Sequence, residues 1–347
     1  MIKNIIFNFL NTASKIKERE VKAVVFSFIF VVVLMSAYYI LRPVRDAMAS
    51  DWTDAEVSWL WTLNFFISTV IVALYGIMVS KFRFRLLVPV MYGIFAGSFI
   101  IFYVLGSIYA DQILIDKAFY VWVSVFSLFH ISVFWSFMSE LFSKEQSSRL
   151  FGIIAVGASV GGLIGPSITA FFSVSLGTDK LMLIASIMLL IPIPIIFYLQ
   201  SLKTKELNNE VLSTPISNQS IGGNPLAGFK MFFSNPYLLS IGLFIFLYTG
   251  ISSFVYFELK NLLSDFTRPE RSVIWAQMDL AVNILAISTG LFATGRIVTK
   301  FGMPTTIAMV PIMICIGLLV LAISPLLGVV MILQIVRRAG NYAVTRP

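Results

Sequence analysis

The sequence predicts an all-α integral membrane protein that crosses a bilayer many times, and three observations support this. Of its 347 residues, 58% are hydrophobic and only 12% are charged, whereas a soluble domain carries about 25% charged residues. The mean hydropathy of the chain is +0.91. Apolar runs recur along the sequence, and each reaches the roughly 18 residues that cross a hydrocarbon core of about 30 Å as a helix.

Ten apolar segments are long enough to be spans, and six of them precede a long polar connection. The segments cover approximately residues 22–43, 57–80, 86–107, 117–140, 151–175, 181–200, 237–259, 274–295, 304–324 and 326–347. Residues 202–236 combine charged and amide side chains with a Gly-Gly-Asn-Pro turn, which predicts a solvated linker. We therefore expect a cytoplasmic segment at residues 1–21, a six-helix bundle at 22–201, this linker, and a four-helix bundle at 237–347.

Basic residues are distributed unevenly between the loops, and this sets the expected orientation. They gather before the first span, in alternate short loops and in the linker, whereas residues 49–56 hold three acids and no base. The positive-inside rule then places the N-terminus and the linker in the cytoplasm. Loop 260–273 departs from the rule, because Lys260, Arg268 and Arg271 fall on the external side. The net charge of +8 thus reflects membrane topology and does not indicate nucleic-acid binding.

The two halves of the chain carry similar features, which indicates an internal repeat. Ser80–Arg85 after the second span and Gly295–Gly302 after the eighth both have the composition of tight basic turns on the cytoplasmic side. A parallel repeat of six-helix units is a known transporter architecture. Since Pro347 would end the chain inside the tenth span, we expect the C-terminal bundle to be incomplete here and to continue with further helices.

Several classes of protein are excluded by what the sequence lacks. The single cysteine, Cys315, and the single histidine, His130, cannot build a disulfide framework or a metal site rich in these residues. Gly-x-Ser-x-Gly, His-Glu-x-x-His and Walker motifs are also missing. We therefore expect neither an enzyme nor an ATP-driven pump, and no cofactor or metal. His130 is expected to be a hydrogen-bonded core residue.

The first candidate site lies at the outer end of the first span. Tyr38 and Arg42 are four residues apart and share one helix face, and Arg45 and Asp46 follow within a turn. Charged side chains inside spans are costly and are usually functional. The alternative is that both arginines extend to the outer lipid headgroups, with Asp46 as their partner.

The second candidate site lies in the tenth span. Arg337 and Arg338 are too deep to reach either membrane surface easily, and Tyr342-x-x-x-Arg346-Pro repeats the Tyr-x-x-x-Arg-Pro pattern of the first span. Several arginines that face one cavity suit an anionic, phosphate-bearing substrate, because guanidinium binds phosphate through two parallel hydrogen bonds. The alternative for Arg337 and Arg338 is a structural ion pair with an acid.

The acids available inside the C-terminal spans include Glu258 and Asp279. Asp279 is either a structural partner of Arg338 or a proton carrier, and the same two roles are open to Glu258. In the fourth span Glu140 precedes Lys144 by four residues, which predicts an exposed ion pair.

The fifth span is rich in glycine between Gly157 and Pro166. This stretch resembles a phosphate-binding loop only superficially, since no Lys-Ser or Lys-Thr follows it and the segment is a span. Small residues at this spacing instead predict a helix that approaches its neighbours closely. In a transporter such a contact also suits a hinge or a sliding surface.

Considered together, these residues resemble the major facilitator superfamily, through the basic turns, the two six-helix units and the glycine-rich span. More narrowly, the chain is similar to the bacterial branch of the ATP/ADP translocase (nucleotide exchange) family along Tyr38–Met48, Ile251–Glu258, Ala276–Asn283 and Arg337–Pro347. The resemblance implies a major-facilitator-type helical bundle with a 6+6 plan, of which about ten spans are present. It also implies a cavity lined by spans one, four, seven and ten. That cavity would hold Tyr38, Arg42, His130, Tyr256, Glu258, Arg338 and Tyr342.

The resemblance therefore implies a secondary transporter that works by alternating access and exchanges an anionic phosphate-bearing solute such as ATP or ADP. The expected substrate-binding residues are Tyr38, Arg42, Arg45, Arg337, Arg338, Tyr342 and Arg346, with Glu258 and Asp279 for coupling or ion pairing. The alternatives are proton-coupled transport of another organic anion or drug-like solute, and a non-transporting membrane scaffold or sensor. We expect a monomer in the inner (cytoplasmic) membrane of a bacterium, with no nucleic-acid partner.

Overall fold

The computed structural model describes residues 16–81, 84–109, 112–207 and 227–342, and every regular element in those ranges is a helix. The α-helices are α2 (Val21–Met48), α3 (Asp54–Lys81), α4 (Phe84–Ile108), α5 (Ile113–Leu141), α6 (Lys144–Leu176), α7 (Thr178–Leu190), α8 (Pro192–Lys205), α9 (Ala227–Ser234), α10 (Pro236–Leu262), α11 (Arg268–Phe292), α12 (Thr294–Phe301), α13 (Met303–Ile323) and α14 (Leu327–Gly340). Two short 3-10 helices, η1 (Glu18–Glu20) and η2 (Ala49–Asp51), flank α2. The predicted all-α class is confirmed.

Nine helical stretches of the described ranges are long and apolar enough to cross a membrane, and they coincide with the first nine expected spans. The tenth expected span contains the shorter α14, while residues 343–347, including Arg346, lie outside the described residues. The sixth span is divided at Ile191 into α7 and α8. Pro192 opens α8 at the first helical position, where its missing amide hydrogen and fixed φ angle are tolerated.

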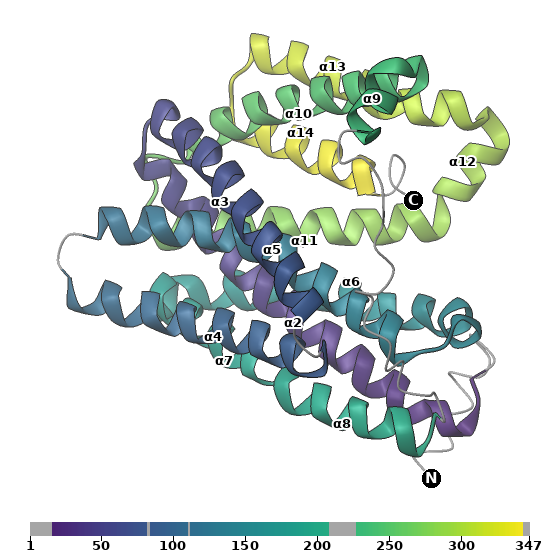
Figure 1. Ribbon diagram of the computed structural model, residues 1–347. Coiled ribbons are helices and arrows are strands. Elements are labelled where there is room, and N and C mark those ends of the chain that lie inside the picture. Colours follow the sequence, from purple (N-terminus) through teal and green to yellow (C-terminus); the bar gives the residue numbers. More distant parts are fainter. Residues whose placement is uncertain (1–15, 82–83, 110–111, 208–226, 343–347) are drawn as a thin grey trace.

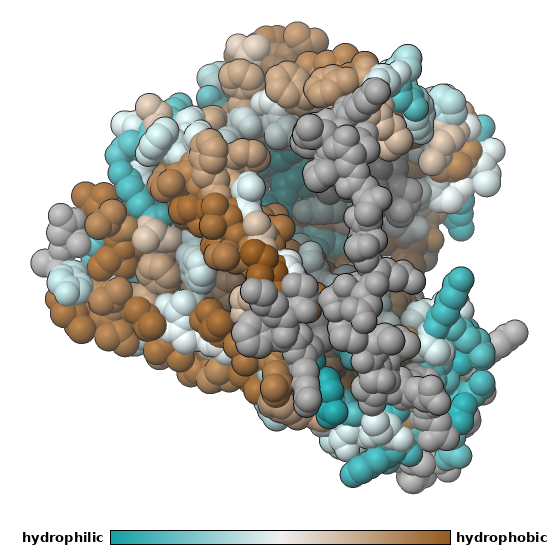
Figure 2. Space-filling model, viewed as in Figure 1, coloured by the Kyte–Doolittle hydropathy of each residue, from teal (hydrophilic) through white to brown (hydrophobic). Residues whose placement is uncertain are grey.

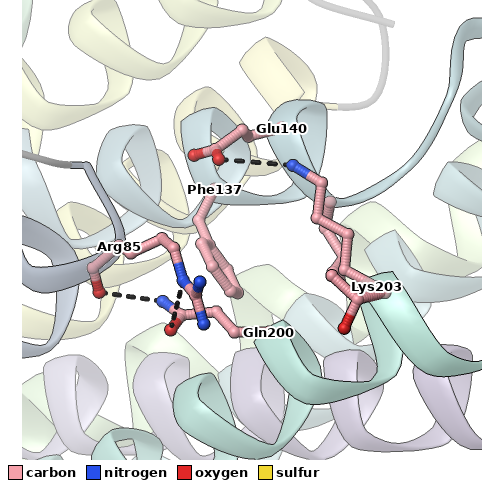
Figure 3. Close-up of a pocket in the computed structure, with 7 residues that line it drawn as sticks. Arg85, Phe137, Glu140, Gln200 and Lys203 are labelled. Carbon is pink, nitrogen blue, oxygen red and sulfur yellow. Dashed lines mark hydrogen bonds and ion pairs between the residues drawn. The ribbon is translucent and has the colours of Figure 1, made fainter. Parts of the chain in front are cut away.

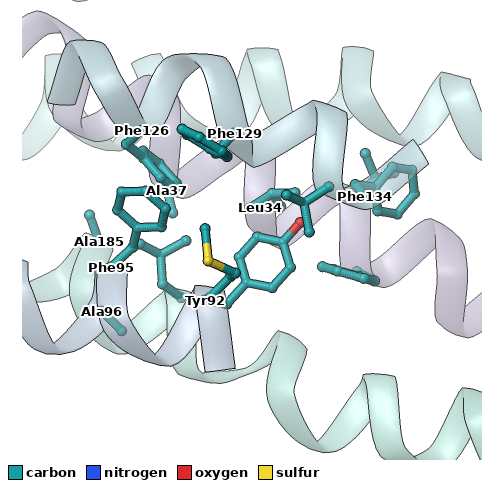
Figure 4. Close-up of a cluster of buried hydrophobic side chains, with 14 of the residues drawn as sticks. Leu34, Ala37, Tyr92, Phe95, Ala96, Phe126, Phe129, Phe134 and Ala185 are labelled. Atoms are coloured by element: carbon teal, nitrogen blue, oxygen red, sulfur yellow. The ribbon is translucent and has the colours of Figure 1, made fainter. Parts of the chain in front are cut away.

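Helices α2 to α8 form the N-terminal half, which lies in the lower part of Figure 1 with α2 at its centre. Helix α2 packs against α5, α6, α7 and α8. Its Leu34 is fully buried, and the aromatic core beside it includes Tyr92 and Phe134 (Figure 4). The hydroxyl of Tyr92 donates to the backbone oxygen of His130 at 2.9 Å, so this buried polar group is satisfied.

Helix α6 packs against α2 through its glycines, as the sequence predicts. A Cβ atom added at Gly161 would stand 2.5 Å from the backbone oxygen of Val32, and one at Gly165 would stand 2.5 Å from that of Ser36. The two helix backbones are therefore in direct contact. Close backbone approach through small residues supplies the van der Waals attraction that holds helices together in lipid.

Leucine at Gly161 or Gly165 is expected to destabilise the fold by about 3 kcal/mol, the upper end of overpacking costs, and to abolish transport. The added side chain would need space that is filled by backbone, which cannot move aside as a side-chain end can. Gly152 lies on the same helix, and a Cβ there meets nothing within 4 Å, so Gly152→Leu is the matched control. Thermal unfolding of the purified variants measures the effect. Unchanged midpoints for both core variants would contradict the close packing.

Helices α10 to α14 form most of the C-terminal half, which meets the N-terminal half mainly along α11. This helix packs against α6 and α2 on one side and against α14 on the other. Its Trp275 and Met278 belong to a second apolar core with Leu259 of α10 and Leu333 of α14. Figure 2 shows a hollow between the halves with hydrophilic residues in its depth, and hydrophobic residues over much of the outer surface.

Two expected connections differ from the structure or extend beyond its described part. The basic turn predicted after the eighth span is wrong in detail, because Thr294–Phe301 forms the short helix α12. That helix ends at Gly302, whose positive φ of +80° favours glycine. The expected linker is described only near its ends, where α8 continues to Lys205 and α9 covers Ala227–Ser234. Residues 208–226 lie outside the described residues.

Candidate functional site

Five charged side chains form a continuous series of ion pairs between the two halves. On α2, Arg45 pairs with Asp46 at 2.6 Å, and Arg42 approaches Asp46 at 3.7 Å. Arg42 also reaches Asp279 of α11 at 3.5 Å, and Asp279 pairs with Arg338 of α14 at 2.5 Å. Positive and negative groups therefore alternate, an arginine stands at each end, and Asp279 is held from both halves.

Helix periodicity and burial explain this arrangement. Arg42 and Asp46 are four residues apart on α2 and share one face. The side chains of Asp46 and Asp279 are only 3% and 2% exposed, so each carboxylate needs a cationic partner. Arg42 and Arg45 are 17% and 14% exposed; Arg42 reaches across to α11, and Arg45 also donates to Ser124 of α5. They do not extend to the outer headgroups, and that alternative from the sequence does not describe this structure.

Arg337 is buried next to this series and pairs with no acid in the described part of the chain. Its Nε and one Nη donate to Oε1 of Gln334 at 3.1 and 2.7 Å. The other Nη donates to Oγ of Ser252 and lies 3.5 Å from the hydroxyl of Tyr248. These partners are all neutral, so they satisfy the hydrogens of Arg337 but leave its charge without a counter-ion.

The buried charges of the site do not cancel. The arginines are Arg42, Arg45, Arg337 and Arg338, and the aspartates are Asp46 and Asp279. One Nη of Arg338 is buried and has no hydrogen-bond partner among the described residues. An anion that accepts hydrogen bonds from Arg337 and Arg338 would satisfy this nitrogen and compensate the charge. Because adjacent residues on a helix point about 100° apart, such an anion must offer more than one acceptor.

Two tyrosines, one from each half, lie near Arg42. Tyr38 stacks on His130, with ring centroids 4.2 Å apart and an angle of 22° between the planes. His130 is buried, and its Nδ1 lies 3.3 Å from the backbone oxygen of Phe126, which confirms the expected core role. Tyr342, just after α14, is 44% exposed and lies within electrostatic reach of Arg42.

Sequence reasoning identified the charged members of the site but missed its neutral ones. Tyr248 and Ser252 are one turn apart on α10, and Gln334 is three residues before Arg337 on α14. That spacing is the only sequence signal for them, and many polar pairs in spans share it. The predicted pairing of Arg338 with Asp279 is present in the structure.

Two sequence-predicted residues stand apart from this arrangement. Glu258 is half-buried on α10 and makes no ion pair with another residue of the described ranges. Arg346 lies outside the described residues, so its place in the site stays a prediction.

A separate small pocket lies at the end of the N-terminal half that is predicted to be cytoplasmic (Figure 3). It is lined by residues of α4, α5 and α8. Within it Lys203 donates to Glu140 at 3.3 Å, and Gln200 donates to the backbone oxygen of Arg85 at 2.8 Å. The predicted pair of Glu140 with Lys144 is therefore wrong, because α5 ends before Lys144, which belongs to the next helix.

Comparisons with known proteins agree with this architecture. A family model described as Major Facilitator Superfamily matches residues 26–343. Among solved structures, a bacterial homolog of the human lysosomal transporter Spinster, in an inward-facing and unoccupied conformation, is similar with a TM-score of 0.52. The two share 16% sequence identity over 93% of this chain and 73% of that chain, and at this identity the likeness shows the fold alone. No curated protein matches the sequence.

Proposed function

The chain belongs to the major facilitator superfamily and is a multi-pass secondary transporter, and on that premise we propose that it exchanges anionic solutes that carry phosphate. ATP and ADP are the proposed pair. The superfamily match supports transport of a small solute. The choice of nucleotides is supported by the sequence resemblance to the translocases and by the chemistry of the candidate site.

The observation that carries the proposal is the surplus of buried arginine between the halves. Arg337 has only neutral partners among the described residues, and Arg338 has a buried nitrogen without one. Guanidinium groups suit phosphate because their planar fork matches two phosphate oxygens at once. A phosphate group with at least two negative charges would therefore complete both the hydrogen bonding and the charge balance of the site.

The same surplus favours exchange over one-way transport. An empty site of this kind carries uncompensated positive charge, and an uncompensated arginine costs roughly 2.5–3.5 kcal/mol on insertion scales when it must stay inside a bilayer. The bound anion removes most of that charge. The loaded carrier should therefore reorient readily, while the empty carrier reorients slowly.

The tyrosines support a nucleotide in particular. Tyr38 already stacks with an aromatic partner, His130, and the exposed Tyr342 lies within electrostatic reach of Arg42. Tyrosine rings near a phosphate-binding arginine provide a surface for a purine base, since offset stacking is the preferred geometry of aromatic pairs.

Uptake into vesicles tests this function. Full-length protein in proteoliposomes loaded with unlabelled ATP is expected to take up labelled ATP or ADP, and vesicles without internal anion should take up far less. Labelled lysine serves as the cationic control and should not enter. Equal uptake with and without internal anion would contradict exchange. Failure to take up ATP, ADP and inorganic phosphate would contradict the anion proposal itself.

Proton-coupled transport of another organic anion is the second candidate, and Glu258 is the observation that favours it. This carboxylate is half-buried and has no ion-pair partner among the described residues. Asp279 is already paired with Arg42 and Arg338, so Glu258 is the better candidate among the acids of the described C-terminal spans. In the same vesicles, uptake driven by a pH gradient and lost in Glu258→Gln would favour this candidate.

A further inference from the structure

Three helices repeat one spacing between the candidate site and the end of the molecule predicted to be external. Each carries, at four-residue intervals, a charged residue at that end, an aromatic residue beneath it and a polar residue at the level of the site. The triplets are Asp116–Tyr120–Ser124 on α5, Lys260–Tyr256–Ser252 on α10 and Arg271–Trp275–Asp279 on α11. Four residues make about one helical turn of 5.4 Å, so the side chains form an ionic layer, an aromatic layer and the site below them.

The ionic layer is centred on Asp51 at the end of η2. Its carboxylate accepts hydrogen bonds from Arg268 at 2.5 Å and from Arg271 at 2.6 Å, both on α11 of the other half. Arg271 also donates to the backbone oxygens of Leu263 and Ser264, at 2.9 and 2.6 Å. One N-terminal carboxylate thus holds two C-terminal arginines, and one of these arginines shapes the loop between α10 and α11.

Two further contacts of this layer have the same polarity. Lys260 of α10 pairs with Asp54 at 2.9 Å and donates to the backbone oxygen of Trp52 at 2.6 Å. Arg268 also pairs with Asp116 of α5 at 2.7 Å. In each pair the acid comes from the N-terminal half and the base from the C-terminal half. The basic residues that depart from the positive-inside pattern therefore find their counter-ions in the acidic loops opposite.

The aromatic layer connects this surface to the site. The hydroxyls of Tyr120 and Tyr256 are 3.3 Å apart across the two halves. Nε1 of Trp61 donates to the Tyr120 hydroxyl at 2.7 Å, and the rings of Trp61 and Trp275 lie 5.4 and 5.5 Å from that of Tyr256. The guanidinium of Arg45 lies 5.4 Å from the centre of the Tyr120 ring. A site arginine thus contacts the layer that closes above it.

The opposite end of the molecule lacks such connections within the described ranges. The ion pairs at that end include Lys22–Glu206 at 2.5 Å, Arg149–Glu20 at 3.0 Å and Lys203–Glu140 at 3.3 Å, and they stay inside the N-terminal half. Between described residues, no hydrogen bond or ion pair joins the two halves there. Among the described residues, hydrogen bonds and ion pairs between the halves are therefore found at the predicted external end and at the site, and not at this end.

We propose that these two layers are a latch that holds the predicted external end shut, with Asp51 as its central residue and the Tyr120–Tyr256 contact as its inner part. The latch sets the balance between the closed and open states of this end. It requires that the halves move apart during transport but does not depend on which solute is carried.

Asp51 is the sharpest point at which to test the latch. Without its charge, Arg268 and Arg271 both lose their shared counter-ion, and the side chain of Arg271 is only 7% exposed. Loss of one partner from a buried pair costs more than the pair contributes, because an unpaired charge remains. Opening of this end would return both arginines to water and relieve that cost.

Pulsed electron–electron resonance between two spin labels measures the opening directly. The labels are placed at Ser58→Cys on α3 and Asp265→Cys between α10 and α11, both exposed, in a Cys315→Ser background reconstituted in lipid nanodiscs. In the unmodified protein, the distance between the two labels should be mainly the shorter one, which corresponds to the closed state. Asp51→Asn is expected to raise the ratio of long to short distances roughly tenfold, the shift that the loss of partly buried ion pairs produces in a two-state balance. Tyr256→Phe, which removes only a hydroxyl, should give a smaller shift in the same direction.

The matched control is Glu56→Gln. Glu56 pairs with Lys117 at 2.7 Å at the same end of the molecule, but both residues belong to the N-terminal half. This variant should leave the distances unchanged. An unchanged distribution in Asp51→Asn, or an equal shift in Glu56→Gln, would overturn the latch. If the label distances shift in Asp51→Asn but not in Tyr256→Phe, the aromatic layer is not part of the latch. The readout involves no transported solute, so it is independent of the proposed anion.

Discussion

Replacement of Arg337 by glutamine is expected to reduce uptake of the phosphate-bearing anion by roughly 10- to 100-fold, the effect of losing a hydrogen bond from a charged donor. Gln334, Ser252 and Tyr248 hold this guanidinium in place without neutralising it, so its charge is available to a ligand. Arg337→Lys is expected to recover little, because lysine keeps the charge but loses the planar fork. The initial rate of labelled ATP or phosphate uptake into proteoliposomes measures both variants.

Arg296→Gln is the matched control for this prediction. Arg296 lies on α12, is exposed, and makes no ion pair with a described residue. The same change of charge there should leave uptake close to that of the unmodified protein. Thermal unfolding of Arg337→Gln separates a binding defect from misfolding, since its neutral partners should tolerate a neutral side chain. A folded Arg337→Gln protein with normal uptake would remove Arg337 from the site.

The spans could be predicted because crossing a bilayer depends on apolar length, which hydropathy reads directly. The close approach of Gly161 and Gly165 to a neighbouring helix could be predicted for a related reason, since small residues let helices approach in lipid, but the identity of that helix, α2, could not. The helix α12 could not, because Thr294–Phe301 is too short to register over a window of about 19 residues. The division at Ile191 was not predicted, although Pro192 and Pro194 directly after it are a sequence signal for a helix boundary.

The charged residues of the candidate site could be identified from the sequence. Placing a charge inside a span costs free energy, so charged residues in spans are usually functional. Their partners were less visible, since hydropathy does not report how a helix is rotated or which neighbour it meets. One alternative placed Asp46 beside arginines at the membrane surface, whereas in the structure it links Arg42 and Arg45 inside the bundle. Ser252 and Gln334 are neutral and carry no such cost, so nothing in the sequence distinguished them.

The loop that departs from the positive-inside rule shows the same limit, because the sequence does not show which side chains meet. Lys260, Arg268 and Arg271 are counted as surface charges when the sequence is read alone. In the folded chain they face the acids of residues 49–56 and Asp116 across the two halves. Charge rules that consider each loop separately cannot detect compensation between loops that are distant in sequence.

The pair of Asp279 and Arg338 leads to the second large expected effect, which concerns stability and transport together. Arg338→Ala leaves Asp279 with only the longer contact to Arg42, and Asp279→Ala leaves Arg338 with no acid among the described residues. Each single variant should lose about 3–5 kcal/mol of stability, as expected when one partner of a buried ion pair is removed. The double variant should unfold closer to the unmodified protein than either single variant, because it leaves no unpaired member of this pair.

Transport then distinguishes a purely structural pair from a binding arginine. If Arg338 binds the anion, the double variant regains stability but stays inactive; if the pair is only structural, uptake recovers with the fold. Thermal unfolding and vesicle uptake of the same four proteins provide the comparison, and Asp265→Asn, a change at an exposed acid, is the control for loss of a carboxylate. We expect stability without uptake, because one nitrogen of Arg338 is buried and unsatisfied next to Arg337, which already lacks a counter-ion within the described ranges. Full uptake by the stable double variant would show that the anion binds without Arg338, and the phosphate-binding role would then rest on Arg337 and Arg42.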